Sequence, residues 1–260
     1  MNLDPFLIDI SLSILTIAPT FLLLILAGFM VIPKPIPEPI IAALVKSGVL
    51  LPLIALLFVG LELFLSEKNY LTFTLLDMYE LGSFQFEIAY FIDTKGFFFT
   101  LLGISLSYTI AFFAQKYMHR EPGYLRFFTL YALFFAGMTT VTLAWTVETL
   151  FIGWEMVGLS SALLVAFFHE RTMPTRNAFH LWLVYRVSDA ALFLGMFFLH
   201  EAIGEVFFQT LLEQGNGAIN DEHKSAIIFI AGLMIILSVM AKSALIPFFG
   251  WLPRAMDGPT

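Results

Sequence analysis

The sequence predicts an all-α fold: a polytopic membrane helix bundle of about seven transmembrane helices, with one broken helix and a small hairpin on its outer face. Hydrophobic residues fill 59% of the 260 positions and charged residues only 13%, against about 25% charged in soluble proteins. The mean hydropathy is +0.88. Seven apolar segments approach the roughly 20 residues that a helix needs to cross a bilayer, at about 10–32, 47–65, 96–114, 127–145, 150–168, 179–199 and 226–247.

The first two segments are joined by PKPIPEP at 33–39, whose prolines cannot continue a helix and give a stiff, extended connection. Farther along, FQFEI at 84–88 alternates with the period of a strand, which predicts a hairpin with the apolar stretch at 70–79. An irregular, packed loop is the alternative. We therefore divide the chain into residues 1–95, two helices with the hairpin, and residues 96–260, a helix bundle.

The later segments predict tight packing and an interruption. The connection between 127–145 and 150–168 is very short, so these helices must be antiparallel neighbours. In the last segment, Pro247 lacks a backbone N–H and its ring crowds the carbonyl of Ser243. We expect the helix to break just past Lys242, which would expose carbonyls of the kind found at ion sites in transporters.

The loop charges predict how the bundle is oriented. The N-terminus, MNLDPFLIDI, has no basic residue, so it does not resemble a cleavable signal peptide. With the N-terminus outside, eight bases fall in inner loops and three in outer loops, as the positive-inside rule favours. The inner ones are Lys34, Lys46, Lys116, Arg120, Arg126, Arg171, Arg176 and Arg254, and the outer ones are Lys68, Lys95 and Lys224. We expect a multi-pass protein of the cytoplasmic (inner) membrane.

Composition excludes several functions. The net charge is −7, which leaves no basic face for nucleic acid. The chain has no cysteine, which removes disulfides, Cys-ligated iron–sulfur clusters and thiolate zinc sites. The five histidines are scattered, without the spacing of a metal or haem site. We expect no cofactor, no metal, and no redox or hydrolytic site in this chain.

Four charged residues lie inside the predicted spans, and they are the candidate functional residues: Glu155, Arg186, Asp189 and Lys242. A charge at the bilayer centre costs roughly 2.5–3.5 kcal/mol on insertion scales, so it is rarely kept without a partner or a function. Two acids and two bases on three helices are typical of an ion or proton path. Glu62 and Glu148 lie near outer helix ends, where we expect them to be solvated.

Each of these charges has a functional and a structural interpretation. Glu155 is either a proton carrier or counter-charge, or a structural glutamate bonded to a neighbour. Lys242 is either a desolvated amine that exchanges a proton, or a lysine that snorkels to the inner interface. Arg186 and Asp189 are three residues apart and can pair on one helix face; the pair either tunes the charge on Glu155 or is only a bridge.

Three segments resemble a known family. GWEMVGLSSALL at 153–164, YRVSDAALFL at 185–194 and AKSALIPFFGWLPRAMDGPT at 241–260 are similar to the antiporter-like membrane subunits of respiratory complex I and Mrp-type Na⁺/H⁺ antiporters. The resemblance implies that Lys242 is the proton-exchanging lysine and that Glu155 is the glutamate beside it. Asp189 and Arg186 match the family's pair on the intervening helix.

Within that family, residues 167–194 most resemble the membrane subunits of DAB-type inorganic-carbon accumulation complexes. This implies that a proton or Na⁺ gradient energises CO₂ or bicarbonate uptake through a large peripheral, zinc-containing, carbonic-anhydrase-like partner. The alternatives are a proton-pumping subunit of an NADH–quinone oxidoreductase, Mrp antiporter or membrane hydrogenase, and a truncated structural scaffold. The family continues into a second, inverted half, so we expect the bundle at 96–260 to be cut short before its end.

Overall fold

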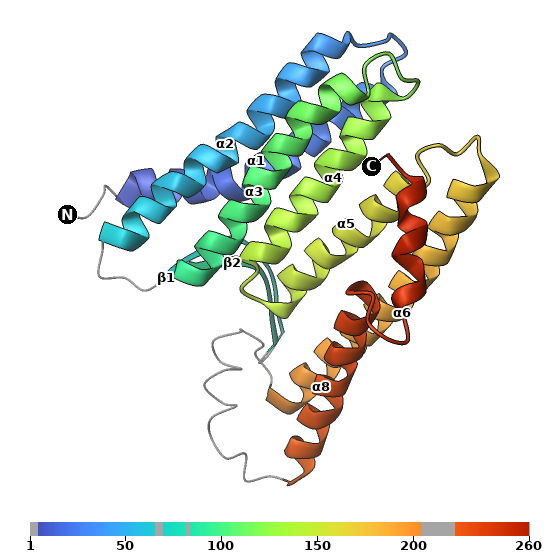
Figure 1. Ribbon diagram of the computed structural model, residues 1–260. Helices are drawn as coiled ribbons and strands as arrows, with labels where there is room; N and C mark the ends of the chain where they lie inside the picture. The colour runs from blue at the N-terminus through green and yellow to red at the C-terminus, as the bar shows by residue number, and fades with distance from the viewer. Residues whose placement is uncertain (1–4, 66–69, 82–83, 204–221, 260) are drawn as a thin grey trace. The chain divides into compact units, whose positions relative to one another are not determined.

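The computed structural model describes residues 5–65, 70–81, 84–203 and 222–259. In these ranges seven helices are long and apolar enough to cross a membrane (Figure 1). They are α1 (Pro5–Val31), α2 (Glu38–Leu65), α3 (Thr94–Tyr117), α4 (Tyr124–Leu143), α5 (Val147–Val165), α6 (Thr172–Ile203) and α8 (Glu222–Lys242). The predicted all-α membrane bundle is confirmed.

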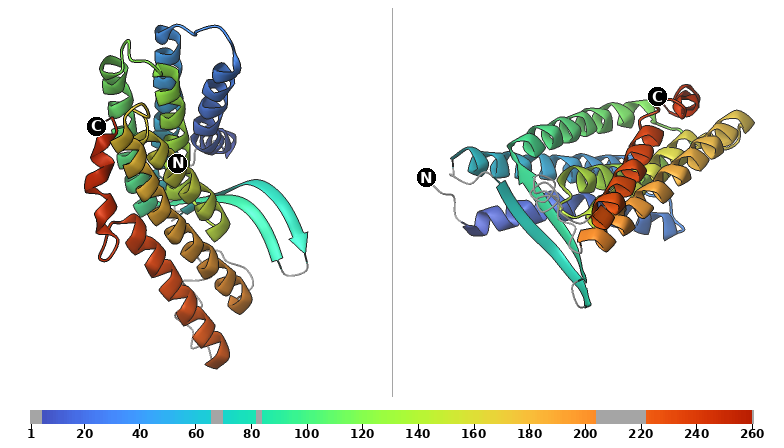
Figure 2. Two further views of the ribbon diagram at one scale, coloured as in Figure 1. Left: turned by 90° about the vertical axis from the view of Figure 1, so that its right-hand side faces the viewer. Right: turned by 90° about the horizontal axis from the view of Figure 1, so that it is seen from below.

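The predicted hairpin is also present, and its strands are longer than the sequence pattern indicated. Strand β1 covers Tyr70–Leu81 and β2 covers Phe84–Asp93. Figure 2 shows the two strands side by side as a curved ribbon. The side chain of Asp93 ends β2 and caps α3 by accepting the backbone N–H of Gly96 at 2.7 Å, which satisfies one of the free donors at a helix start.

The chain groups into two compact units. Unit 1 comprises residues 1–75 and 90–144, and unit 2 comprises residues 76–89 and 145–260. Helices α1 to α4 therefore belong to unit 1, whereas α5, α6 and α8 belong to unit 2. The sequence analysis divided the chain at residue 95 instead. That division concerns segments of the sequence, and it stays a prediction.

Unit 1 is a packed set of four helices in which glycines let neighbours approach closely. A Cβ on Gly60 of α2 would lie 2.2 Å from Cε2 of Phe97, so the phenyl ring fills the space above the glycine. Phe97 is in turn held edge-on by Phe64, with ring centroids 5.7 Å apart. Small residues at helix interfaces are the usual means of close packing in membranes.

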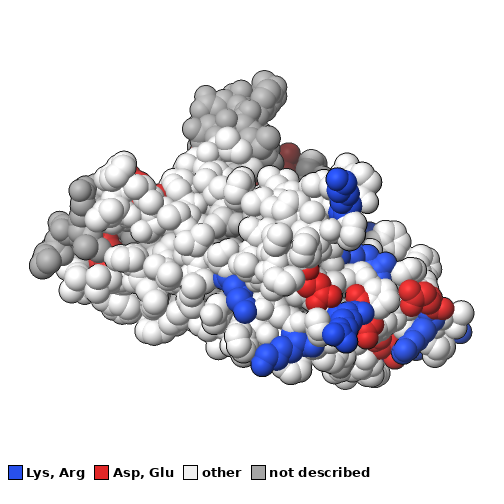
Figure 3. Space-filling view, turned by 90° about the horizontal axis from the view of Figure 1, so that it is seen from above, with Lys and Arg blue, Asp and Glu red and all other residues white. Residues whose placement is uncertain are grey.

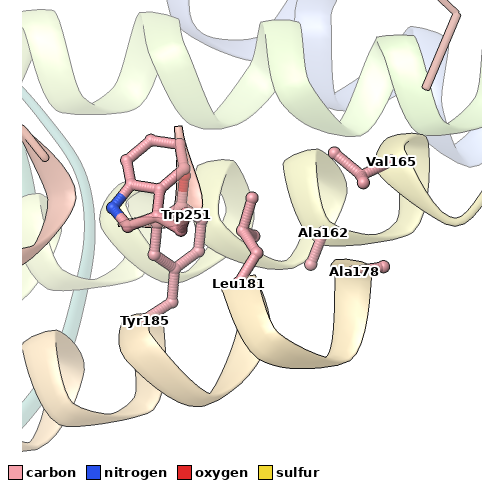
Figure 4. Packing of buried hydrophobic residues seen from close by; sticks show 6 residues of the cluster. All are labelled: Ala162, Val165, Ala178, Leu181, Tyr185 and Trp251. Atoms are coloured by element: carbon pink, nitrogen blue, oxygen red, sulfur yellow. The ribbon is translucent and has the colours of Figure 1, made fainter. Parts of the chain in front are cut away.

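Unit 2 packs α5, α6 and α8 with two short 3₁₀ turns, η1 (Phe249–Trp251) and η2 (Pro253–Asp257). Its apolar core is drawn in Figure 4: four side chains from α5 and α6, with Tyr185 and Trp251 in edge-to-face contact at 5.3 Å. The four are Ala162, Val165, Ala178 and Leu181. Trp251 also donates its indole N–H to the carbonyl of Ala241 at 2.9 Å, which ties the segment after α8 back to the helix.

The predicted helix break is confirmed at Lys242, the last residue of α8. The N–H of Leu245 reaches back to the carbonyl of Met240 at 3.0 Å. Ala244 takes a left-handed φ of 54°, which is the conformation that commonly ends helices. The lysine therefore stands at the point where regular helix gives way to an irregular turn.

The outer surface is dominated by uncharged side chains. Most of the face in Figure 3 is white, and blue and red groups are confined to part of it. Large phenyl rings point outward from α3, with Phe98, Phe99 and Phe113 between 57% and 64% exposed. Such a surface suits contact with lipid or with other membrane subunits.

Candidate functional site

The four intramembrane charges predicted from the sequence come together in unit 2 as one chain of ion pairs. Nη2 of Arg186 lies 2.6 Å from Oε2 of Glu155 and 2.7 Å from Oδ2 of Asp189. The other carboxylate oxygen of Asp189 lies 3.4 Å from Nζ of Lys242. The series of ion pairs runs from Glu155 on α5, through Arg186 and Asp189 on α6, to Lys242 on α8.

Helix geometry explains why α6 supplies the two middle groups. Residues three apart lie on the same face of a helix, so Arg186 and Asp189 share the face of α6 that contacts Glu155 of α5 and Lys242 of α8. A hydroxyl contact beside Asp189 holds α6 against α8: Ser188 donates to the carbonyl of Ser238 at 2.9 Å. The predicted i,i+3 pair is therefore present, but it is not closed on itself, because each member has a second partner of opposite charge.

Lys242 is enclosed by backbone and aromatic groups. Its ammonium donates to the carbonyl of Trp154 at 2.5 Å and lies 4.3 Å from the centroid of that indole ring. The ring of Tyr185 is 5.4 Å away, so two aromatic faces stabilise the cation. The side chain is 10% exposed. It is turned into unit 2, which does not fit a lysine that snorkels to the interface.

A glycine on α5 makes room for this ammonium. A Cβ on Gly158 would lie 3.1 Å from Nζ and 3.4 Å from Cε of Lys242. The missing side chain lets the end of Lys242 lie directly against the helix backbone. Gly158 therefore helps to position the end of Lys242 against α5.

One pairing differs from the expectation. The resemblance implied that Glu155 lies beside Lys242, whereas the carboxylate within ion-pair distance of the ammonium is that of Asp189. Glu155 pairs with Arg186 instead. The reason is that α6 places its own acid next to the end of α8, and its arginine reaches α5. The ion pairs that connect Glu155 to Lys242 run through the α6 pair.

Burial is uneven along the chain of charges. The side chain of Asp189 is 4% exposed, whereas those of Glu155 and Arg186 are 29% and 38% exposed. Within the described ranges, neither oxygen of Asp189 accepts a hydrogen bond of good geometry, so ion pairing alone holds this carboxylate. A buried acid held in this way is well placed to take up a proton when one of its cations moves away.

Two further acids were wrongly expected to be solvated. Glu62 is 2% exposed and Glu148 is 5% exposed. Glu148 forms an ion pair with Nε2 of His200, across the interface between α5 and α6. The sequence placed Glu148 correctly near a helix end, but strand β2 covers that end: Ala89 donates its N–H to Oγ1 of Thr149 at 3.1 Å.

No metal centre emerges from the described parts of the chain. Within them, no three His, Asp or Glu side chains gather as metal ligands do. The chemistry that the arrangement supports is proton exchange among carboxylates, an amine and an imidazole.

Comparison with known proteins identifies the same family that the three sequence segments resemble. A family model described as "NADH:quinone oxidoreductase/Mrp antiporter, TM" matches residues 144–260, which hold all four charges. A second, described as "NADH-Ubiquinone oxidoreductase (complex I), chain 5 N-terminus", matches residues 78–128. The chain belongs to the antiporter-like membrane subunit family of complex I and Mrp antiporters.

Relatives of this antiporter-like chain are longer than it. It is 33% identical to the NAD(P)H-quinone oxidoreductase chain 5 of Synechocystis sp. over 180 residues, which is 69% of this chain and 26% of the relative. It is 32% identical to the chloroplastic subunit 5 of Gossypium barbadense, again over 69% of this chain and 24% of the relative. The aligned part thus spans about a quarter of the length of these relatives.

A solved structure has the same fold. A chain in the membrane-bound sulfane sulfur reductase, an archaeal respiratory membrane complex, aligns with a TM-score of 0.78 and 17% identity. The alignment covers 96% of this chain and 48% of that one. The two chains therefore share a fold.

Proposed function

We propose that this chain is a proton-translocating, antiporter-like subunit of an NADH–quinone-oxidoreductase-type membrane complex. The observation that carries the proposal is the chain of three ion pairs from Glu155 to Lys242. Charges in a membrane helix bundle are rarely kept without a partner or a function, and intramembrane ionisable residues commonly mark proton relays. The names of the relatives favour this type of complex over other antiporter-like assemblies.

The mechanism follows from the shared position of Arg186. Its guanidinium touches both Glu155 and Asp189. When Glu155 is ionised and draws Arg186 toward α5, the carboxylate of Asp189 is left to Lys242 and keeps the amine protonated. When Arg186 moves toward Asp189, Lys242 loses its counter-charge, and desolvation drives its proton off. The proton state of Glu155 thus controls that of Lys242 through α6.

Protons are the ion that this arrangement fits. Every acid in the chain of charges already faces a cationic side chain, so a second cation such as Na⁺ would have to displace one. Moving one charge across the membrane is worth about 2.3 kcal/mol per 100 mV. This energy would pass to or from the other subunits of the complex. The loop charges favour the N-terminus outside the cytoplasmic membrane.

The test uses Lys242→Ala and Glu155→Gln in the assembled complex in sealed membrane vesicles. We expect proton uptake driven by the complex to fall at least tenfold in both variants, while the subunit remains in the membrane. Lys46→Ala on α2 is the matched control for the lysine, and Glu121→Gln, an exposed loop acid, is the control for the glutamate. Normal proton uptake in both site variants would overturn the proposal, and Na⁺-dependent uptake would assign a different ion.

A second candidate is energisation of inorganic-carbon uptake through a zinc-containing, carbonic-anhydrase-like partner. It rests on the resemblance of residues 167–194 to DAB-type membrane subunits. The two candidates differ in what purifies with the chain from native membranes. Quinone- and iron–sulfur-bearing subunits support the oxidoreductase type, whereas one large soluble zinc protein supports carbon uptake.

A further inference from the structure

A second pair of ionisable groups lies in unit 2, away from the four charges. Glu148 is in the first turn of α5 and His200 is in the last turn of α6. Oε1 of Glu148 is bonded to Nε2 of His200, and the two side chains are 5% and 15% exposed. An acid and an imidazole enclosed together at the edge of a membrane span form a proton-exchange group by their chemistry alone.

Polar groups from the start of α5, beside Glu148 in the sequence, gather with those of β2. Oγ1 of Thr146 lies 2.8 Å from Oγ1 of Thr149, and both hydroxyls approach the carbonyl of Glu87 on β2, at 3.3 and 3.5 Å. Trp145 donates its backbone N–H to the carbonyl of Ala89 at 3.0 Å. We call this end of unit 2, where α5 begins beside residues 87–89, the hairpin end. Hydroxyls and carbonyls here provide partners for water next to the pair.

The pair lies in line with the four charges on both helices. Glu148 precedes Glu155 by seven residues, which is nearly two full turns and a rise of about 10 Å. His200 follows Asp189 by eleven residues, which is about three turns and 16 Å. Residues at these spacings share a helix face to within about 20°. One face of the α5–α6 interface therefore carries ionisable groups at two depths.

The pair lies where α5 begins and α6 ends. The N-terminus of α5 stabilises a carboxylate and the C-terminus of α6 stabilises an imidazolium. Other charged or titratable groups at the hairpin end, among the described residues, are Glu87 on β2, Glu201 on α6, and His223 and Lys224 on α8. The residues between the two depths are apolar: on α6 the same face carries Leu192 and Met196, which pack in the core of unit 2.

We propose that Glu148 and His200 form the proton-exchange site of the relay at the hairpin end, where protons pass between the aqueous side and Glu155. This rests on the proposed function. In the step, the imidazolium of His200 gives one proton through transient water to the carboxylate of Glu155, and neutral His200 stays bonded to Glu148. The protonated Glu155 releases Arg186 toward Asp189, and a proton from the aqueous side then restores the imidazolium. The apolar stretch between the depths keeps water out except during transfer.

The test separates proton exchange from a structural ion pair. His200→Arg keeps a cation beside Glu148 but cannot release a proton near neutral pH, so a structural role would be preserved. We expect proton uptake in the assembled complex to fall at least tenfold. His200→Gln, which keeps a hydrogen bond without a charge, gives the same loss. His169→Arg, at an exposed loop position, is the matched control and keeps wild-type uptake.

The outcomes distinguish this proposal from the function on which it rests. Wild-type uptake in His200→Arg together with loss in Lys242→Ala overturns the role of the pair and leaves the relay intact. Wild-type uptake in all of these variants overturns the relay itself. If His200→Arg fails to assemble, His200→Gln decides: loss of uptake with a normal amount of assembled complex supports the proposal, and normal uptake overturns it.

Discussion

Units 1 and 2 are built from helices of similar length, but their interiors hold different kinds of polar interaction. In the interior of unit 1, hydroxyls bond to nearby carbonyls, as when Tyr131 donates to the carbonyl of Ser107. The ion pair between His119 and Glu38 in the described part of unit 1 lies at helix ends, and its side chains are 58% and 32% exposed. In unit 2, two sets of paired charges lie between α5, α6 and α8, and one reaches an interrupted helix. The buried Glu62 on α2 is the exception in unit 1.

The difference indicates which unit carries chemistry. Hydroxyls that bond to backbone carbonyls cost little at membrane depth, whereas charges are expensive and tie helices into one arrangement. The polar groups of unit 1 therefore fit a role in helix packing, and those of unit 2 fit the proposed relay. Substitutions in unit 1 should change stability alone, and substitutions in unit 2 should change transport.

The largest effect is expected for Asp189→Ala. The change leaves the ammonium of Lys242 without its carboxylate and removes one of the two acids around Arg186, so an uncompensated charge stays buried. Breaking a buried pair in this way costs about 3–5 kcal/mol. The measurement is the thermal unfolding midpoint of the purified complex. Thr139→Val, which removes a buried hydroxyl from unit 1, is the control and should cost far less; equal losses would remove the distinction between the units.

Two glycine substitutions should separate stability from transport. In unit 1, Gly60→Ala forces a methyl group against the ring of Phe97, which Phe64 and Phe98 hold in place. Overpacking of this kind costs about 1–3 kcal/mol, with proton uptake per assembled complex unchanged. In unit 2, Gly158→Ala pushes the ammonium of Lys242 away from the carbonyl of Trp154. Uptake per complex should fall severalfold there while stability changes by less than about 1 kcal/mol. The reverse pattern would contradict the assignment of roles.

A smaller effect is expected for Tyr131→Phe in unit 1. The phenol donates to the carbonyl of Ser107 at 2.5 Å, and removing the hydroxyl costs about 0.5–1.5 kcal/mol. Denaturation in detergent measures the loss, and vesicle assays should give wild-type proton uptake. Reduced uptake at normal stability would extend the relay into unit 1.

The features of the fold that depend on local sequence could be predicted better than those that depend on contacts between distant residues. The spans follow from apolar runs, because the bilayer sets their length. Their ends were less well predicted: α2 begins at Glu38, not near residue 47, because the apolar residues at 39–45 belong to the same helix and Lys46 does not interrupt it. The break after Lys242 was predictable from Pro247, since the missing N–H and the ring act locally.

The residues of the site could be predicted from the sequence, but which of them form ion pairs with one another could not. Insertion energy alone singles out Glu155, Arg186, Asp189 and Lys242. Which acid faces the lysine depends on how α5 and α8 are rotated against α6, and no local pattern encodes that rotation. Glu148 was misjudged for a similar reason, because β2 covers the start of α5 through contacts between residues about 60 positions apart.

The smallest effect is expected for Glu38→Gln. Its partner His119 is more than half exposed, and exposed pairs contribute about 0–1 kcal/mol. Raising the salt concentration should remove even that contribution by screening. A salt titration of the unfolding midpoint in wild type and variant checks this expectation, and a change comparable to that of Asp189→Ala would contradict it.

The most direct measurement for the relay is proton uptake in the double variant Asp189→Leu with Lys242→Met. Replacing a buried pair by apolar residues of similar volume is often neutral or stabilising, and Arg186 keeps Glu155 as its partner. If the charges move protons, the complex assembles and unfolds as in wild type, but proton uptake is lost. If the charges only hold the helices together, uptake persists at the wild-type level, and the relay is contradicted.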